Sequence, residues 1–454
     1  MSKYRYQLSD YHAVGKADIL LEGITVLSGE NGSGKSTLSL WLYYLVNGSR
    51  RYEEFVYNVF ENNLQTALSP MSTTSREILQ LMTLAKFPSD LDFPSIKRPS
   101  LWFSKENNVD MNHERNVSRM TDFYVKATKQ YAIILEEFLN DKTVSKDRQK
   151  RVLNQLGFED YWLDRLPKVV ADTYSQRALQ KLNTYTEQLH SALNKRQPEV
   201  LKQAFQTMFG ETDSVPNQIQ LFEDDVALLD NDLVYELYNL NRAIYIDSPL
   251  ALSNRISHSG FWEELNKLIL EDGGDVGATE KKMVRRIEKL LHGRAKRVEK
   301  FSLFSNDAEL HYVDSDNNIE IEVDKTATGF KTFIYLQRLL ENGYLTKNTI
   351  ILVDEPEVHL HPQWIVEYAR LLVLLNKSLG VKFLLASHNP DMVAAIRAIA
   401  EREGTLGQTH FYLAERDDST AKYIFKDLGT EIGEIFSSFN IALNRIQMYG
   451  TDSL

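Results

Sequence analysis

The stretch Ile24–Tyr43, which reads ITVLSGENGSGKSTLSLWLY, decides the fold of this chain. Within it, Gly29–Ser36 matches the pattern G-x-x-x-x-G-K-[ST] in full, the pattern of a loop whose backbone N–H groups hold phosphates. The apolar run Ile24–Leu27 precedes the loop, and Thr37–Leu45 carries apolar residues at helical spacing. A strand, a glycine-rich loop and a helix in this order predict a phosphate-binding site at the N-terminus of the helix.

The side chains of this loop indicate what it binds. A lysine at the position of Lys35 reaches the β- and γ-phosphate oxygens of a nucleotide, and a hydroxyl at the position of Ser36 is a ligand for Mg²⁺. We therefore expect ATP and Mg²⁺ as cofactors. The residues predicted to contact the nucleotide are Glu30, Asn31, Gly32, Ser33, Gly34, Lys35, Ser36 and Thr37.

A second part of the predicted site lies far along the chain. The β-branched, apolar run Thr349–Val353 is typical of a strand buried on both faces, and Asp354 and Glu355 follow it directly. At the tip of such a strand, Asp354 can hold Mg²⁺ together with Ser36. Glu355 can orient the attacking water as a general base, which favours hydrolysis over transfer to another acceptor. The alternative interpretation is that the two carboxylates cap the next helix.

A third apolar run, Lys382–Ala386, is followed by Ser387, His388 and Asn389. If this run forms the strand next to the one that ends at Asp354, His388 is placed to contact the γ-phosphate. We predict a catalytic sensor role for His388, beside Lys35 and Glu355. An ordinary loop histidine is the alternative.

Together, GENGSGKST, ILVDEPEVHLHP and LLASHNP resemble the ABC-type ATPase heads of the RecF/SMC/OLD superfamily. They are most similar to the stand-alone AAA-21-like ATPases of bacterial anti-phage systems, such as the ATPase subunits of Septu and PARIS. The resemblance covers residues 1–48 and 300–454. It implies an α/β fold, in which a P-loop ABC-type head with a mixed sheet and flanking helices is interrupted by a large, mainly helical insertion at 49–299.

The resemblance also implies a pairing of two heads, because such heads close each other's nucleotide with a Ser-Gly signature at a helix start. The corresponding place reads Thr326–Lys331, ahead of a helix expected at Thr332–Leu340. Thr328 and Gly329 are therefore candidate contacts to the nucleotide of a second copy, with Phe330 standing where a second glycine is common. The alternative is a plain helix cap with glycine. If the signature holds, the ATP state is a homodimer or a higher oligomer.

In function, the resemblance implies a sensor or scaffold ATPase that controls a separate effector of the nuclease type. The alternative is a RecF/SMC-like ATPase that binds DNA in repair or chromosome maintenance. We expect no nuclease on this chain, because few residues follow His388 and Asp417-Asp418 lacks a companion glutamate. ABC-type heads also carry a glutamine in a segment called the Q-loop. Gln65 and Gln80 are equal candidates for this glutamine.

The remaining patterns concern the rest of the chain. Helical spacing dominates residues 121–209, the runs Leu101–Phe103 and Arg242–Ile246 are predicted strands, and Glu309–Val313 with Ile319–Val323 is a predicted hairpin. One basic helix is predicted from Gly277 to about residue 300, a surface for nucleic acid or for an acidic partner.

Composition limits the class of protein. The chain has 454 residues, 43% of them hydrophobic, no cysteine and a formal net charge of −11. The absence of cysteine excludes disulfides and cysteine nucleophiles. There is no apolar run of membrane-spanning length and no leader pattern, so we expect a cytoplasmic protein without a membrane segment. The acidic charge disfavours a nucleic-acid-coated protein and leaves local binding of nucleic acid open.

Overall fold

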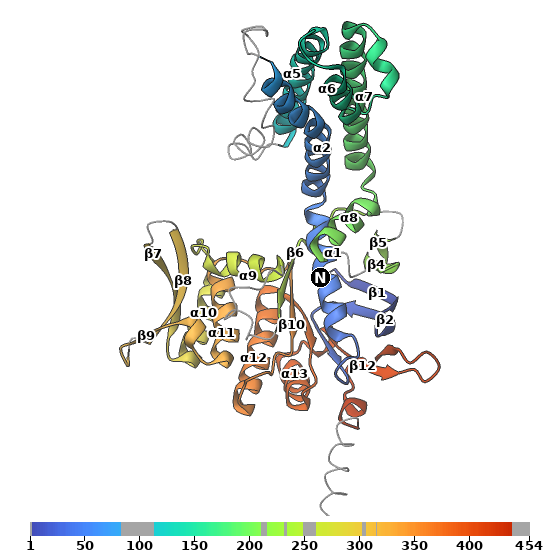
Figure 1. Cartoon of the computed structure of the whole chain (residues 1–454). Coiled ribbons are helices and arrows are strands. Elements are labelled where there is room, and N and C mark those ends of the chain that lie inside the picture. The colour runs from blue at the N-terminus through green and yellow to red at the C-terminus, as the bar shows by residue number, and fades with distance from the viewer. Residues whose placement is uncertain are drawn as a thin grey trace, which may run out of the picture. The chain divides into compact units, whose positions relative to one another are not determined.

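The computed structural model describes residues 2–82, 113–209, 216–230, 234–247, 260–301, 306–314 and 316–437. The chain divides into two compact units (Figure 1). The head unit consists of residues 1–51 and 197–454, and the helical unit consists of residues 52–196. The predicted strand Leu101–Phe103 lies outside the described residues.

The head unit is built on a mixed, 10-stranded sheet with the strand order β5-β4-β1-β2-β13-β12-β3-β11-β10-β6. Its strands are β1 (Tyr4–Tyr11), β2 (Val14–Leu21), β3 (Ile24–Ser28), β4 (Gln218–Glu223), β5 (Val226–Leu229), β6 (Arg242–Ile246), β10 (Thr349–Asp354), β11 (Lys382–Ala386), β12 (Thr409–Arg416) and β13 (Tyr423–Asp427). The neighbours from β12 to β6 pair in parallel, whereas β1 pairs in antiparallel with β2 and β4. The predicted strands that end at Leu27, Ile246, Val353 and Ala386 are thereby confirmed.

The central parallel strands are buried over their whole length, because helices cover both faces of the sheet. The head-unit helices are α1 (Lys35–Arg50), α8 (Pro198–Phe209), α9 (Gly260–Leu270), α10 (Ala278–Leu291), α11 (Thr328–Glu341), α12 (Pro362–Leu379) and α13 (Pro390–Glu403). Helix α1 packs on β6, β10 and β11. Alternate residues such as Val26, Ile351 and Leu385 instead share one core with α9–α13. In Figure 1, α10–α12 accordingly lie to the left of β10 and α1 to its right.

The predicted basic helix is shorter than expected, because the second half of the basic run forms a strand of a second sheet. The helix α10 ends at Leu291, and the following residues form β7 (Arg294–Phe301), which pairs with β8 (Asn306–Asp314). The strand β9 (Ile319–Glu322) completes this three-stranded sheet and confirms the predicted hairpin. His292 ends α10 in a left-handed conformation, with φ of 55°, and Gly293 follows it. This chain reversal breaks a run of basic residues that was continuous in sequence.

The helical unit contains α2 (Tyr52–Leu81), α5 (His113–Asn140), α6 (Lys146–Gln155), the short 3₁₀ helix η2 (Asp160–Asp164) and α7 (Pro167–Lys195). Helices α2, α5 and α7 pack against one another, and Tyr131 of α5 is fully buried between them. Its hydroxyl lies 2.5 Å from the Thr74 hydroxyl of α2. Pro70 lies inside α2, and the carbonyl of Pro70 accepts a hydrogen bond from Thr74. The helical pattern read over residues 121–209 is thus confirmed for α5–α8.

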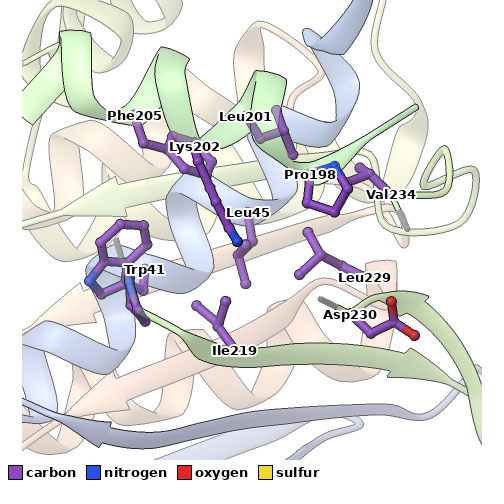
Figure 2. A pocket seen from close by; sticks show the side chains of 11 residues that line it. Trp41, Leu45, Pro198, Leu201, Lys202, Phe205, Ile219, Leu229, Asp230 and Val234 are labelled. Carbon is purple, nitrogen blue, oxygen red and sulfur yellow. The ribbon is translucent and has the colours of Figure 1, made fainter. Parts of the chain in front are cut away.

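The C-terminal half of α1 borders a small cavity beneath α8 (Figure 2). The cavity encloses about 30 Å³, enough for one or two water molecules and far too little for a nucleotide. Its walls are mostly apolar, and Lys202 reaches into it from α8 above Ile219. The catalytic motifs are therefore not associated with this cavity.

The end of α9 depends on α11. A helix leaves its last carbonyl groups without partners, and Arg338 donates to the carbonyls of Ile269 (3.0 Å) and Glu271 (2.7 Å). Asn342 donates to the carbonyl of Leu268 at 2.6 Å. Arg338 is 6% exposed, so water cannot replace its hydrogen bonds.

We predict that Arg338→Met lowers the free energy of unfolding by about 2–4 kcal/mol, because the buried Ile269 carbonyl and the half-buried Glu271 carbonyl lose their donor and Glu341 loses its ion pair. Arg370→Met is the matched control, since the Arg370 side chain is 41% exposed and meets Glu367 only at 3.8 Å. The control should cost less than about 0.5 kcal/mol. Urea unfolding followed by circular dichroism measures both, and equal losses would contradict this role of Arg338.

Candidate active site

Three neighbouring parallel strands end at one edge of the large sheet. In the register of the sheet, Ala386 of β11 lies between Leu27 of β3 and Asp354 of β10. The glycine-rich loop, the Ser387-His388 segment and the Asp354-Glu355 pair therefore start side by side. Ligands of open α/β sheets bind at the carboxyl ends of the strands, which makes this edge the candidate site.

The glycine-rich loop is fitted closely to the strands around it. Gly34, with φ of 94°, precedes α1, and a Cβ there would lie 2.6 Å from the side chain of Val14. A Cβ on Gly29 would lie 2.7 Å from Cβ of Ala414. At Gly32, by contrast, a Cβ would meet nothing within 4 Å. Gly29 and Gly34 are thus needed because a side chain would collide with the neighbouring strands. A side chain at Gly32 would point into open space.

Lys35 folds back onto its own loop. Its ammonium donates to the carbonyls of Gly29 (2.9 Å) and Glu30 (2.8 Å) and to Oγ of Ser33 at 3.3 Å. Burial lowers the pKa of Lys35, and nearby carboxylates, first among them Asp354, oppose that shift. Because the ammonium is held by neutral oxygens, it can exchange them for phosphate oxygens without breaking an ion pair.

Asp354 is 3% exposed. Its Oδ2 accepts a hydrogen bond of 2.8 Å from Tyr245 of β6, whereas Oδ1 is buried without a partner among the described residues. Burial raises the pKa of Asp354, and the hydroxyl groups of Ser36, Tyr245 and Ser39 lower it. A buried carboxylate oxygen without a donor, beside the Ser36 hydroxyl, fits a hard cation such as Mg²⁺.

Glu355 and His388 lie at the mouth of this site. The Glu355 side chain is 43% exposed, and the carboxylate comes within 3.9 Å of Nδ1 of His388. Glu355 has a φ of 50°, a left-handed conformation that costs about 1–3 kcal/mol in a residue with a side chain. Its backbone N–H donates to the Ala386 carbonyl at 2.8 Å, which holds this conformation against β11.

A further acidic residue, Glu357, lies behind His388. It is 6% exposed and accepts hydrogen bonds from Oγ of Ser387 (2.9 Å) and from the backbone N–H of His388 (3.0 Å). Burial raises the pKa of Glu357, and the donors of Ser387 and His388 oppose that shift. Glu357 belongs to the segment DEPEVHLHP, yet its sequence context gave it no role.

The signature-like turn has a different local structure from the one expected. Helix α11 begins at Thr328 rather than at Thr332, the N-cap residue is Ala327, and no side chain caps the helix. The expected hydroxyl cap is therefore not formed, and Thr326 donates its hydroxyl to the Val323 carbonyl. A Cβ on Gly329 would lie 3.0 Å from the His359 carbonyl, so this glycine allows α11 to approach the loop after Glu355. Contact of Thr328 with a second copy stays a prediction.

The predicted site residues of the head unit thus divide into two places. Loop residues 30–37, Asp354, Glu355 and His388 gather at one sheet edge, whereas Thr328 and Gly329 start α11. The glutamine candidates Gln65 and Gln80 both lie on α2 of the helical unit. His361 is the N-cap of α12.

Sequence reasoning missed Tyr245, which belongs to β6 and meets Asp354 only through the pairing of β6 with β10. No local pattern could have linked two residues so far apart in sequence. It also missed Glu357, for which one signal existed, a carboxylate two residues after the Asp-Glu pair.

The chain resembles known proteins at two levels. It is 35% identical over 94 residues to the Septu protein PtuA of Bacillus thuringiensis, a match that covers 18% of this chain and 23% of that protein. The chain thus matches less than a quarter of the length of this relative.

No helix among the described residues is long and apolar enough to span a membrane.

Two solved structures align over most of the chain at low similarity. The SmcHead bound to the C-winged helix domain of ScpA gives a TM-score of 0.36 at 11% identity, over 93% of this chain and 97% of that chain. The Smc head domain with a coiled coil and joint from Pyrococcus yayanosii gives 0.34 at 10% identity, over 96% and 100%.

The model of the AAA ATPase domain family matches residues 7–393. This match and the local similarity to PtuA confirm the resemblance to ABC-type ATPases of the RecF/SMC/OLD group. The match runs from β1 into α13 and includes the glycine-rich loop, Asp354 and His388. The chain belongs to the AAA ATPase domain family.

Proposed function

We propose that this protein binds and hydrolyses ATP at the sheet edge where β3, β10 and β11 end. The observation that carries the proposal is the unpartnered Oδ1 of buried Asp354 beside the Ser36 hydroxyl. A carboxylate and a hydroxyl that share a cation with substrate phosphates are the arrangement by which nucleotide-hydrolysing proteins bind Mg²⁺. Mg²⁺ would be held by Ser36 and Asp354, and it supplies positive charge to the phosphates.

Residues of the chain bind the phosphates, orient the attacking water and hold Asp354 in place. The N-terminus of α1 and the Lys35 ammonium bind the β- and γ-phosphates. Glu355, exposed at the mouth of the site, accepts a proton from the attacking water and orients it. His388 donates to the γ-phosphate from the neighbouring strand end. Tyr245 holds Asp354 in place from β6.

Two substitutions separate binding from hydrolysis. Lys35→Ala should abolish ATP binding, because the loop loses the ammonium that binds the β- and γ-phosphates. Glu355→Gln should keep ATP affinity within about threefold and lower kcat about 100-fold or more, because only proton acceptance is lost. Calorimetry and phosphate release measure the two quantities. Unchanged turnover in Glu355→Gln would remove Glu355 from the role of general base.

We further propose that ATP pairs two heads through the start of α11. Support comes from the N-terminus of a 14-residue helix, where Thr328 is half-buried and no side chain within the described chain caps the helix. Free backbone N–H groups and the helix dipole at such an end favour a phosphate, which a second copy would supply.

With ATP and Mg²⁺, the Glu355→Gln variant should therefore sediment as a dimer or a higher oligomer, and without ATP as a smaller species. Thr328→Glu should prevent this association through repulsion from the γ-phosphate. It is a cleaner probe than a change at Gly329, since any Cβ there would press on the His359 carbonyl. Analytical ultracentrifugation tests both variants. Association of Thr328→Glu at wild-type affinity would refute the signature.

For biological role, we propose a sensor or scaffold subunit of a bacterial anti-phage system in the cytoplasm, which controls a nuclease-type effector on a separate chain. The local match to the Septu protein PtuA supports this assignment. The net charge of −11 also favours a protein partner over extended nucleic-acid contact.

The alternative is a DNA-binding ATPase, for which α10 is the specific observation. Lys282, Arg285 and Lys289 are exposed on this helix, and its opposite face is buried by Met283 and Ile287. Reversing Lys282, Arg285 and Lys289 to glutamate should leave ATP turnover unchanged and weaken binding of the effector. Fluorescence anisotropy with duplex DNA distinguishes the two readings: tight, salt-sensitive binding by the wild type that is lost in the reversal variant would support the alternative.

A further inference from the structure

Glu357 is a buried carboxylate beside the site that the proposed mechanism does not use. Its side chain is 4% exposed. Burying an ionised carboxylate is costly unless hydrogen bonds compensate, and two donors to Glu357 come from the segment that follows β11. Ser387 donates its hydroxyl to Oε2 at 2.9 Å, and His388 donates its backbone N–H to Oε1 at 3.0 Å.

Glu357 does not cap either of the helices that flank it. Helix α12 is capped by His361, and helix α13 is capped by Asn389, whose Oδ1 accepts from the N–H groups of Asp391 and Met392. Glu357 therefore does not complete a helix end. Its hydrogen bonds instead tie the loop after β10 to the loop after β11.

The same carboxylate faces the ring of His388. Oε1 of Glu357 lies 3.4 Å from Nδ1, closer than the 3.9 Å from Nδ1 to the Glu355 carboxylate. Nδ1 is buried and has no hydrogen-bond partner of good geometry among the described residues. A small rotation of the ring would align Nδ1–H with Glu357, and the proton on Nδ1 then fixes the orientation in which Nε2 points outward.

We propose that Glu357 is a positioning residue for His388: it anchors the Ser387-His388 backbone and orients the imidazole so that Nε2 faces the γ-phosphate. This inference rests on the proposed ATP hydrolysis. It assigns no proton transfer to Glu357, whose hydrogen bonds go to Ser387 and to the backbone of His388. If Glu357 acts as a positioning residue, its effect on turnover passes through the His388 side chain rather than through its charge near Lys35.

A double-mutant cycle tests this dependence. Glu357→Gln keeps the size of the side chain and one acceptor oxygen, and it should lower kcat about tenfold while KM for ATP stays within about twofold. In a His388→Ala background, the same substitution should change kcat less than twofold, because the group that it orients is already absent. Glu401→Gln, which makes the same chemical change at an exposed position on α13, is the matched control and should equal the wild type.

Each outcome decides between the alternatives. If Glu357→Gln costs the same factor with and without His388, or if His388→Ala alone leaves kcat unchanged, the inference is overturned. If Glu357→Gln does not fold, Ser387→Ala replaces it, since it removes one donor to Glu357 and should show the same dependence on His388. If the wild type hydrolyses no more ATP than Lys35→Ala does, the proposed function fails and this inference with it. Turnover by the wild type with an additive cycle refutes this inference alone.

Discussion

The parallel pairing of β3, β11 and β10 is the constraint on which the rest of the site depends. Parallel strands present their carboxyl ends at one edge, and the register sets Leu27, Ala386 and Asp354 side by side. Because each strand is followed at once by a functional loop, segments that lie hundreds of residues apart in sequence meet there. A shift of register at β11 would separate His388 from both of its acidic neighbours.

Close packing around this edge explains residue choices that phosphate binding alone does not. Gly34 allows the loop to lie against Val14 of β2, and Gly29 allows it to lie against Ala414 of β12. Gly329 similarly allows α11 to lie against the loop after Glu355. The loops therefore rest on rigid supports, and the unpartnered Oδ1 of Asp354 and the left-handed Glu355 are held in place at a cost in stability.

The sequence predicted the parts that depend on local pattern. Strand β3, the glycine-rich loop and α1 follow one another within a single window, and Thr349–Val353 is apolar enough to be read as a buried strand. Pairing across the sheet is not local, so the contact of Tyr245 with Asp354 and the position of Glu357 behind His388 could not be derived. The basic helix was extended too far because charge pattern alone does not show where Gly293 reverses the chain. Helix α11 starts four residues before the predicted Thr332, because the signature-like residues Thr328–Lys331 themselves form its first turn.

The central claim is that one sheet edge assembles a complete site for ATP and Mg²⁺ from these three loops. A crystal structure of Glu355→Gln with ATP and Mg²⁺ tests it most directly. We expect β- and γ-phosphates at the N-terminus of α1 in contact with Lys35, the ion between Ser36 and Oδ1 of Asp354, and Nε2 of His388 facing the γ-phosphate. Phosphates bound elsewhere, or an ion that leaves Oδ1 of Asp354 without a partner, would contradict the account.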